Sequence, residues 1–162
     1  MLEAVGHEHL GQFFEICDRL LKPDGIVALQ FITVPETMYE NYRKSCDWIQ
    51  KYIFPGGVCP SLTAVCNAAA GRSTLVVEHL ENIGPNYART LQEWRKRFRI
   101  STRELDALGY DERFRRMWEY YFAYCEAGFA SRTLGTLQLV LTRPKNTALG
   151  LCPGYSLSGA LG

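Results

Sequence analysis

The protein has 162 residues, of which 47% are hydrophobic and 22% are charged, and its formal net charge is +1. These values predict one folded domain with its own core and exclude a disordered chain. A net charge close to zero gives no indication of a polyanionic partner. No apolar run approaches the roughly 20 residues that span a bilayer, and the first residues lack the basic and apolar segments of a signal peptide. We therefore expect a cytoplasmic protein.

The first part of the chain predicts a helix, a tight turn and a strand. Apolar residues recur at helical spacing over residues 10–21, and turn-forming residues at 22–25 end that helix. Residues 26–34 are almost all apolar, which predicts a strand covered on both faces. Gln30 interrupts this run. Since a buried amide needs a partner, we expect a hydrogen bond to a neighbouring loop or a role in a site.

The middle of the chain predicts two further helices and a second strand. A helical repeat over residues 39–53 ends at the turn 54–57, and Ser61 is expected to cap the next helix. Residues 74–79 predict a strand, and Gly and Pro at 82–86 predict a loop.

The second half predicts an aromatic helical region. A helix is expected over residues 88–99, followed by a short helix that a capping box of Ser101 and Glu104 would start. Asp111 is expected to cap a long helix whose apolar face is rich in aromatic residues.

Residues 136–142 predict a third strand, and residues 145–162 predict a loose tail. The fold class is therefore α/β. Three strands are few for such a sheet, and the first of them would leave an exposed edge.

Few motifs with specific chemistry are present. The sequence has no Gly-x-Gly-x-x-Gly and no P-loop pattern, so a phosphate-binding loop is not expected. His7 and His9 lie beside acidic residues, but histidines two apart do not face one way on a helix, so solvated side chains are favoured over a metal site. Six cysteines without a Cys-x-x-Cys pair favour reduced thiols and no zinc site, with a disulfide framework as the alternative.

A basic run lies in the second half, with Arg95, Lys96, Arg97, Arg99 and Arg103. Its simplest interpretation is a solvated helix face. The functional alternative is a surface for anionic lipid head groups, where each basic residue adds about 1 kcal/mol. Nucleic acid is disfavoured, because few aromatic residues lie within the run.

Several segments in order resemble those of cyclopropane-fatty-acid synthases. They are residues 1–8, 21–32, 51–61, 81–94 and 113–132. The resemblance covers about residues 1–144 and implies the C-terminal portion of a class I methyltransferase domain, with strands five to seven of a Rossmann-like sheet, strand seven antiparallel between the other two, and inserted helices. Strands one to four are expected to be missing, together with the Gly-rich segment that binds S-adenosylmethionine, so the chain alone is expected to be inactive.

The family adds a methylene group across a cis double bond of a phospholipid acyl chain, with S-adenosylmethionine as methyl donor and a bound bicarbonate as base. The resemblance implies that Glu3, Tyr87 and the backbone N–H of Ile32 hold the bicarbonate. Gln30 stands where bacterial members have a histidine, and its amide can still donate a hydrogen bond.

The resemblance also implies that Tyr52, Phe54 and Tyr121 line the path of the lipid. The implied partners are phospholipid acyl chains and a peripheral membrane surface, with a homodimer left open. Two other hypotheses are kept: a non-catalytic product that binds lipid or a partner protein, and a methyltransferase of small molecules. The coding sequence upstream would separate the first of these from an enzyme fragment.

Overall fold

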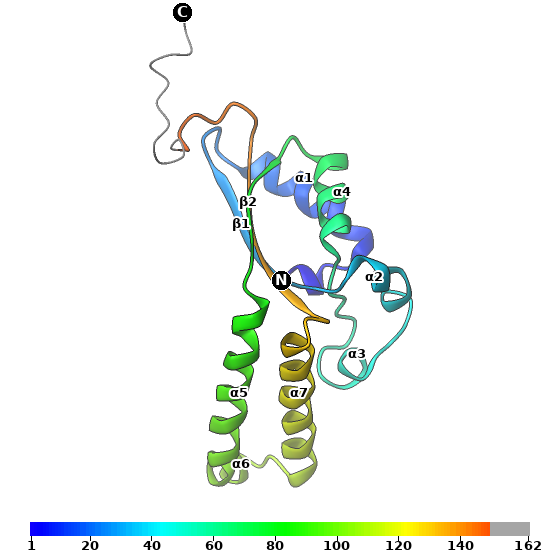
Figure 1. Ribbon diagram of the computed structural model, residues 1–162, viewed down its shortest axis with the longest axis vertical. Coiled ribbons are helices and arrows are strands. Elements are labelled where there is room, and N and C mark those ends of the chain that lie inside the picture. Colours follow the sequence, from blue (N-terminus) through cyan, green and yellow to red (C-terminus); the bar gives the residue numbers. More distant parts are fainter. Residues whose placement is uncertain (150–162) are drawn as a thin grey trace, which may run out of the picture.

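The computed structural model describes residues 1–149 and shows a small sheet from which a pair of long helices projects (Figure 1). Two short 3-10 helices, Leu2–Ala4 and His7–His9, open the chain. The α-helices are α1 (Leu10–Leu20), α2 (Glu36–Tyr42), α3 (Trp48–Tyr52), α4 (Leu62–Arg72), α5 (Gly84–Ile100), α6 (Thr102–Ala107) and α7 (Glu112–Ala130). The strands are β1 (Ile26–Thr33), β2 (Val76–Asn82) and β3 (Gly135–Thr142), so the predicted α/β class is confirmed.

The sheet has the order β1-β3-β2, and β3 runs antiparallel to both neighbours. The last strand of the sequence thus lies between the first two, as expected. β1 pairs with β3 from Ile26 opposite Thr142 to Thr33 opposite Gly135. β2 begins two residues later and ends three residues later than predicted, and it carries an irregularity between Val77 and His79.

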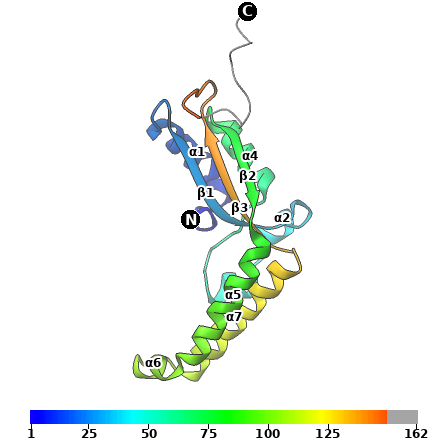
Figure 2. The ribbon, with the colours of Figure 1, turned by 60° about the vertical axis from the view of Figure 1, so that its left-hand side comes forward.

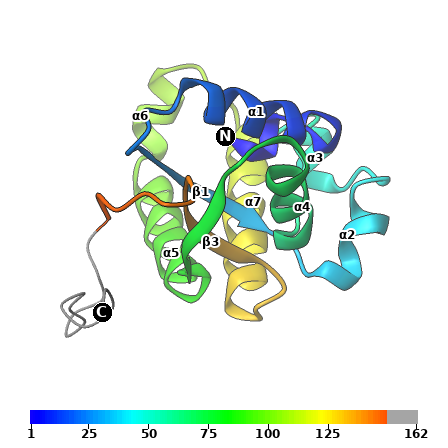
Figure 3. The same ribbon diagram turned by 90° about the horizontal axis from the view of Figure 1, so that it is seen from above.

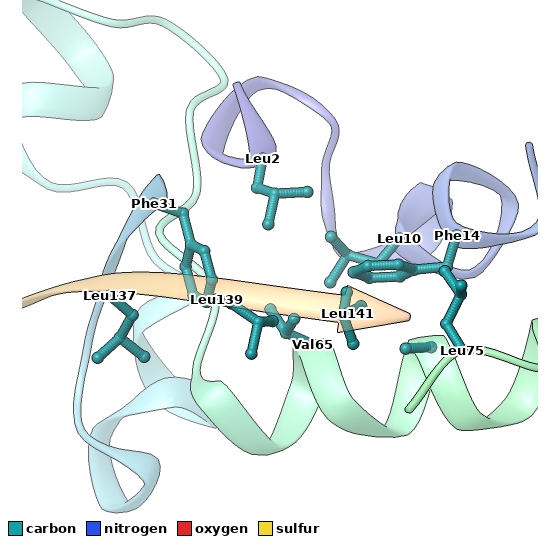
Figure 4. Close-up of a cluster of buried hydrophobic side chains, with 10 residues drawn as sticks. Leu2, Leu10, Phe14, Phe31, Val65, Leu75, Leu137, Leu139 and Leu141 are labelled. Atoms are coloured by element: carbon teal, nitrogen blue, oxygen red, sulfur yellow. The ribbon is translucent and has the colours of Figure 1, made fainter. Parts of the chain in front are cut away.

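One face of the sheet is covered by α1 and α4, which lie on the same side of the strands (Figure 3). Phe14 of α1 is 0% exposed and lies in one apolar cluster with Val65 of α4, Phe31 of β1 and Leu141 of β3 (Figure 4). Leu20 was predicted to share this face, but it is 74% exposed. Six residues of an α-helix rotate Leu20 about 120° away from Phe14, which places it at the solvent side.

The opposite face of the sheet has no helix over it within residues 1–149. Side chains alternate along a strand, so Leu29 and Phe31 face the helices while Ile26, Ala28 and Gln30 face outward. Ile26 is 46% exposed, and every residue of β2 is exposed. The prediction of a strand covered on both faces is therefore wrong for the described chain.

The two long helices α5 and α7 pack side by side and carry α6 at their far end (Figure 2). Their contact buries Leu91, Phe122, Cys125 and Phe129. The Asp111 carboxylate accepts a hydrogen bond from the Phe114 N–H at 2.8 Å, which confirms the predicted cap of α7.

Two local predictions in this region are wrong. α5 begins at Gly84 and not at residue 88, because a proline in the first turn starts a helix well, and a Cβ at Gly84 would lie 3.0 Å from the Thr136 nitrogen. Glycine alone therefore lets the helix start against β3. The capping box of Ser101 is absent, since its side chain makes no capping hydrogen bond to α6.

The ends of three elements are joined at Asp18 of α1. Its carboxylate accepts hydrogen bonds from the Thr74 N–H at 2.7 Å and from the Arg143 guanidinium at 2.9 Å. Arg143 also donates to the Leu21 carbonyl at 2.8 Å. The start of β2 and the end of β3 are thus tied to the end of α1. Of the predicted tail, residues 145–149 form turns next to this junction, and the rest lies outside the described residues.

Replacing Asp18 with asparagine is expected to lower the free energy of unfolding by about 2 kcal/mol at neutral pH, because a charged acceptor of several hydrogen bonds is lost. The Thr74 N–H, helped by Arg143, outweighs burial and holds the pKa of Asp18 below its ordinary value. Because the pKa of Asp18 is lower in the folded state, its ionised form stabilises the fold above the pKa of the unfolded chain, which is about 4. This contribution is lost as the pH falls through the pKa of the folded state.

Urea titrations between neutral pH and the acid transition would measure the effect. The acid-induced fall in stability should be shallower in Asp18→Asn than in the parent chain. Asp24→Asn, in the exposed turn before β1, serves as the control and should follow the parent curve. Equal curves for both variants would refute the role of Asp18.

Candidate functional site

Glu3 connects three separate segments of the chain. Its carboxylate oxygen Oε1 accepts a hydrogen bond from the Ile32 N–H of β1 at 2.7 Å, and its main-chain carbonyl accepts one from the Val58 N–H at 2.8 Å. Its side chain is 25% exposed. The carboxylate is thus held in one position beside the end of β1, but solvent or a ligand can still reach it.

The Glu3 carboxyl is held in its ionised form. Burial alone would raise its pKa, but the hydrogen bond from Ile32, helped by the amine of Met1 at 2.9 Å, outweighs burial and lowers it. The amide of Ile32 carries no charge, so it favours the carboxylate by hydrogen bonding alone. Near neutral pH this group therefore accepts hydrogen bonds and does not donate them.

The turn at residues 54–57 approaches Glu3 from the other side. Gln50, only 8% exposed, donates from Nε2 to the Gly57 carbonyl at 3.0 Å, and the next residue, Val58, donates to Glu3. Gln50 Oε1 in turn accepts from the Asp47 N–H at 2.7 Å as part of a capping box of α3. Gly56 has φ +80°, a conformation that favours glycine. The turn thus has a fixed shape next to the carboxylate.

The helical repeat predicted over residues 39–53 is split in this region. α2 ends at Tyr42 and α3 begins at Trp48, because the Asp47 carboxylate accepts from the Gln50 N–H and starts a new helix.

Aromatic side chains surround the far side of the site. Tyr87 of α5 packs edge-on against Phe129 with 4.9 Å between ring centroids, and the cluster around it includes Ile32. Burial raises the pKa of Tyr87, and the negative charge of Glu3 adds to this effect, so the hydroxyl stays protonated. Tyr87 is thus a hydrogen-bond donor whose titration the Glu3 carboxylate influences.

Two of the three predicted lipid-lining residues meet each other. The rings of Phe54 and Tyr121 are 5.8 Å apart and nearly perpendicular. Burial raises the pKa of Tyr121. Tyr52 lies on the outer side of α3, 45% exposed, against Trp48 and below the ammonium of Lys51. Phe54 and Tyr121 therefore contact each other, whereas Tyr52 contacts Trp48, and both Phe54 and Tyr52 are exposed.

Gln30 and Ile32 are placed differently from their predicted roles. The side-chain oxygen Oε1 of Gln30 accepts a hydrogen bond from Gln138 Nε2 at 3.0 Å on the open face of the sheet. Gln30 thus has a hydrogen-bond partner, but this partner is on the neighbouring strand and not in a loop, and the amide is exposed. The Ile32 N–H donates to Glu3, so in this structure it orients the carboxylate and is not free to donate to another group.

Two cysteines lie close to the site. Burial raises the pKa of Cys59 to about 11 and that of Cys125 to about 12. Their thiols are therefore neutral near physiological pH and unsuited to act as nucleophiles. The five cysteines of the described residues are free, in line with the expected reduced thiols.

Alkylation by iodoacetamide at pH 8 is expected to modify the exposed Cys46 first and to leave Cys59 and Cys125 largely unmodified. At that pH, about one Cys59 thiol in a thousand is ionised, and burial blocks access as well. Peptide mass spectrometry at successive times measures each site. Both cysteines should react readily in urea, and equally rapid labelling of Cys59 and Cys46 in the folded chain would contradict the prediction.

Sequence reasoning missed Gln50, Tyr42 and His7. Gln50 follows Asp47 at the spacing of a capping box, a signal that could have been found. The Tyr42 hydroxyl accepts from the Cys59 N–H at 3.4 Å, and His7 Nδ1 lies 2.7 Å from the Tyr39 hydroxyl. Nothing local in the sequence predicts these last two contacts. His7 and His9 lie at the start of a helical segment, as interpreted from the sequence, and His9 is exposed whereas His7 is half-buried. Within residues 1–149, no three His, Cys, Asp or Glu side chains gather as metal ligands, and no helix has the length and apolar character needed to cross a bilayer.

Comparison with solved structures agrees with this architecture. The mycolic acid cyclopropane synthase CmaA1, solved with SAH and CTAB, matches 87% of this chain with a TM-score of 0.78 and 26% identity. The cyclopropane synthase MmaA2 of Mycobacterium tuberculosis matches with a TM-score of 0.76 at 24% identity, which supports the fold alone. The chain covers 52% of each of these structures. The fold is that of the class I methyltransferases.

Comparison of sequences is more specific. The family described as mycolic acid cyclopropane synthetase matches residues 1–139, and the chain belongs to this family. It is 43% identical over 143 residues to the tuberculostearic acid methyltransferase UfaA1 of Mycobacterium tuberculosis. It is 36% identical over 143 residues to the cyclopropane-fatty-acyl-phospholipid synthase of Escherichia coli. The aligned part is 88% of this chain, but only 34% and 36% of those relatives.

Proposed function

We propose that this chain forms the C-terminal part of an S-adenosylmethionine-dependent enzyme that adds a methylene group across a cis double bond of a phospholipid acyl chain. The observation that carries the proposal is the Glu3 carboxylate. It is fixed by the Ile32 N–H in a region that includes Phe54, Tyr87 and Tyr121, within a member of a cyclopropane synthase family.

The chemistry requires an apolar site with one well-placed base. The double bond would attack the methyl carbon that bound S-adenosylmethionine supplies. The bond from sulfur to that carbon would break, S-adenosylhomocysteine would leave, and the positive charge would pass to the acyl chain as a carbocation. Loss of a proton from the transferred methyl group then closes the ring. The faces of Phe54 and Tyr121 would stabilise the positive charge, as aromatic rings do for cations.

The described side chains fit a bicarbonate as that base. The Glu3 carboxylate is ionised and would accept the bicarbonate hydroxyl hydrogen, while the protonated Tyr87 hydroxyl would donate to one of its oxygens. Ile32 would act through Glu3, since its N–H already donates to that carboxylate. A small anion in an apolar site needs such fixed hydrogen bonds.

A second product is supported by the relative of 43% identity, which is named a tuberculostearic acid methyltransferase. The first step, attack of a double bond on a methyl group, is common to a ring product and to a methyl branch. Joining this chain to the upstream part of that relative and extracting the host lipids would test the function. New cyclopropane or methyl-branched acyl chains support the proposal. Unchanged lipids from a soluble chimera that binds S-adenosylmethionine would refute it and favour a non-catalytic role.

The 162-residue chain alone is expected not to bind S-adenosylmethionine, because no Gly-rich strand-loop segment occurs in its sequence. Isothermal titration calorimetry should show no heat of binding at micromolar concentrations, whereas the chimera should bind. Micromolar binding by the chain alone would show that the donor site lies within these residues.

A further inference from the structure

The far end of the α5–α7 helix pair carries the most exposed apolar side chains of this helical part. α5 has 17 residues, so its end lies about 25 Å from the sheet (Figure 2). Ile100 is 83% exposed, more than any other large hydrophobic residue described, and Leu108 is 73% exposed. Tyr110, beside them in sequence, is 43% exposed. We call residues 97–116 the hairpin tip.

Arginines surround these apolar residues. Arg97, Arg103, Arg113 and Arg116 are exposed and form no ion pair within the described residues. The other two arginines of the tip are neutralised, since Arg115 pairs with Asp106 and Arg99 pairs with Glu119.

Three carboxylates of the hairpin tip, Glu104, Asp111 and Glu112, also lie outside ion pairs in the described structure. The six arginines and four carboxylates of the tip give it a formal net charge of +2, while the whole chain has a net charge of only +1. Positive charge and exposed apolar surface therefore coincide at one projecting end.

We infer that the hairpin tip binds the surface of an anionic phospholipid bilayer, with Ile100 and Leu108 entering the acyl boundary and the free arginines contacting lipid phosphates. Exposed Leu, Ile and Tyr flanked by basic residues are the composition of interfacial membrane-binding elements. An anionic surface is complementary to the excess of arginines.

A row of aromatic contacts links the tip to the candidate site. Tyr110 stacks on Phe114 with 4.3 Å between ring centroids. The centroid distances from Trp118 are 5.9 Å to Phe114 and 5.3 Å to Tyr121. Tyr121 in turn contacts Phe54 beside the site. An enzyme that modifies acyl chains inside a bilayer needs its apolar surface continuous with the membrane. This part of the inference rests on the proposed function, whereas membrane binding itself does not.

Flotation with phosphatidylcholine vesicles, with and without phosphatidylglycerol, tests the inference on the 162-residue chain. The parent chain should float with the anionic vesicles, less so at high salt because surface charges are screened. The variant Ile100→Ser/Leu108→Ser should lose binding at least about tenfold, and Arg103→Gln/Arg113→Gln should lose about as much and most of the salt dependence.

Matched controls lie on α1. Leu20 is as exposed as Leu108, and Arg19 is exposed as well, so Leu20→Ser and Arg19→Gln should leave binding unchanged. Circular dichroism checks that each variant is folded. Three results would overturn the inference: no binding by the folded parent chain, equal loss in the α1 controls, or tip variants that dissociate a dimer without changing flotation. Flotation needs no methyl donor, so its failure leaves the proposed chemistry intact, and inactive chimeras leave the membrane surface intact.

Discussion

In a chimera that carries the upstream part of a relative, Glu3→Gln is expected to lower transfer to phospholipid about 10²- to 10³-fold, which is the usual cost of one lost contact to a reacting oxyanion. The substitution removes the charge that would orient the base, while the amide oxygen can still accept from the Ile32 N–H, so the fold should be unchanged. Incorporation of labelled methyl groups into phospholipid vesicles measures the rate.

Glu15→Gln provides the matched control, because Glu15 is an exposed carboxylate on α1 whose ion pair to Arg72 is long at 3.8 Å. This variant should transfer at the parent rate. Removal of bicarbonate from the buffer should slow the parent enzyme and have little further effect on Glu3→Gln. Parent-like activity of Glu3→Gln would show that the carboxylate does not hold the base.

The open edges of the sheet are expected to make the chain associate with itself. Both outer edges lack a partner strand within residues 1–149, and they carry apolar side chains, with Ile26 of β1 46% exposed and Val77 of β2 48% exposed. Unpaired edges of this kind promote pairing between chains. The 162-residue chain is therefore expected to form oligomers that grow with concentration, as light scattering would show.

A lysine on an edge strand opposes such pairing. Ile26→Lys and Val77→Lys test one edge each, and the edge that makes the contact should show at least about a tenfold rise in the dissociation constant, equivalent to 1.4 kcal/mol. Leu20→Lys on the exposed side of α1 adds the same charge away from both edges and should change nothing. A monodisperse parent chain with a sharp thermal transition would mean that the open sheet is stable alone.

The elements that could be predicted from the sequence are those fixed by local patterns. Phe14 and Val65 recur at helical spacing with their neighbours, and Ser61 and Asp111 cap their helices as predicted. The errors occur where a distant contact decides. A glycine and a proline next to each other suggest a loop, but here the proline lies in the first turn of α5, and the close approach of β3 requires that residue 84 be a glycine.

The open face of the sheet was mispredicted for a similar reason. An almost wholly apolar strand indicates cover on two faces. Its sequence cannot show whether the cover comes from within the same residues, and only one face of β1 is covered here.

The candidate site was predicted only in part. The resemblance pointed to Glu3, Ile32 and Tyr87. Glu3 and Ile32 are 29 positions apart in the sequence and meet only in the folded chain, so the direct bond between them could not be foreseen. Gln50 had a local signal in its capping box with Asp47. Its second hydrogen bond, to the Gly57 carbonyl, depends on how the turn folds back and has no local signal.

The position of β3 in the middle of the sheet determines when the sheet can form during synthesis. Within residues 1–149, β1 and β2 do not pair with each other, and each pairs with residues 135–142. About a hundred residues separate β1 from β3, so at 5–20 residues per second a nascent β1 waits roughly 5–20 s for this partner. α1 and α4 are complete well before β3 and supply Phe14 and Val65 to the same cluster as Phe31. They can cover one face of β1 while the ribosome is still making the strand that completes the sheet.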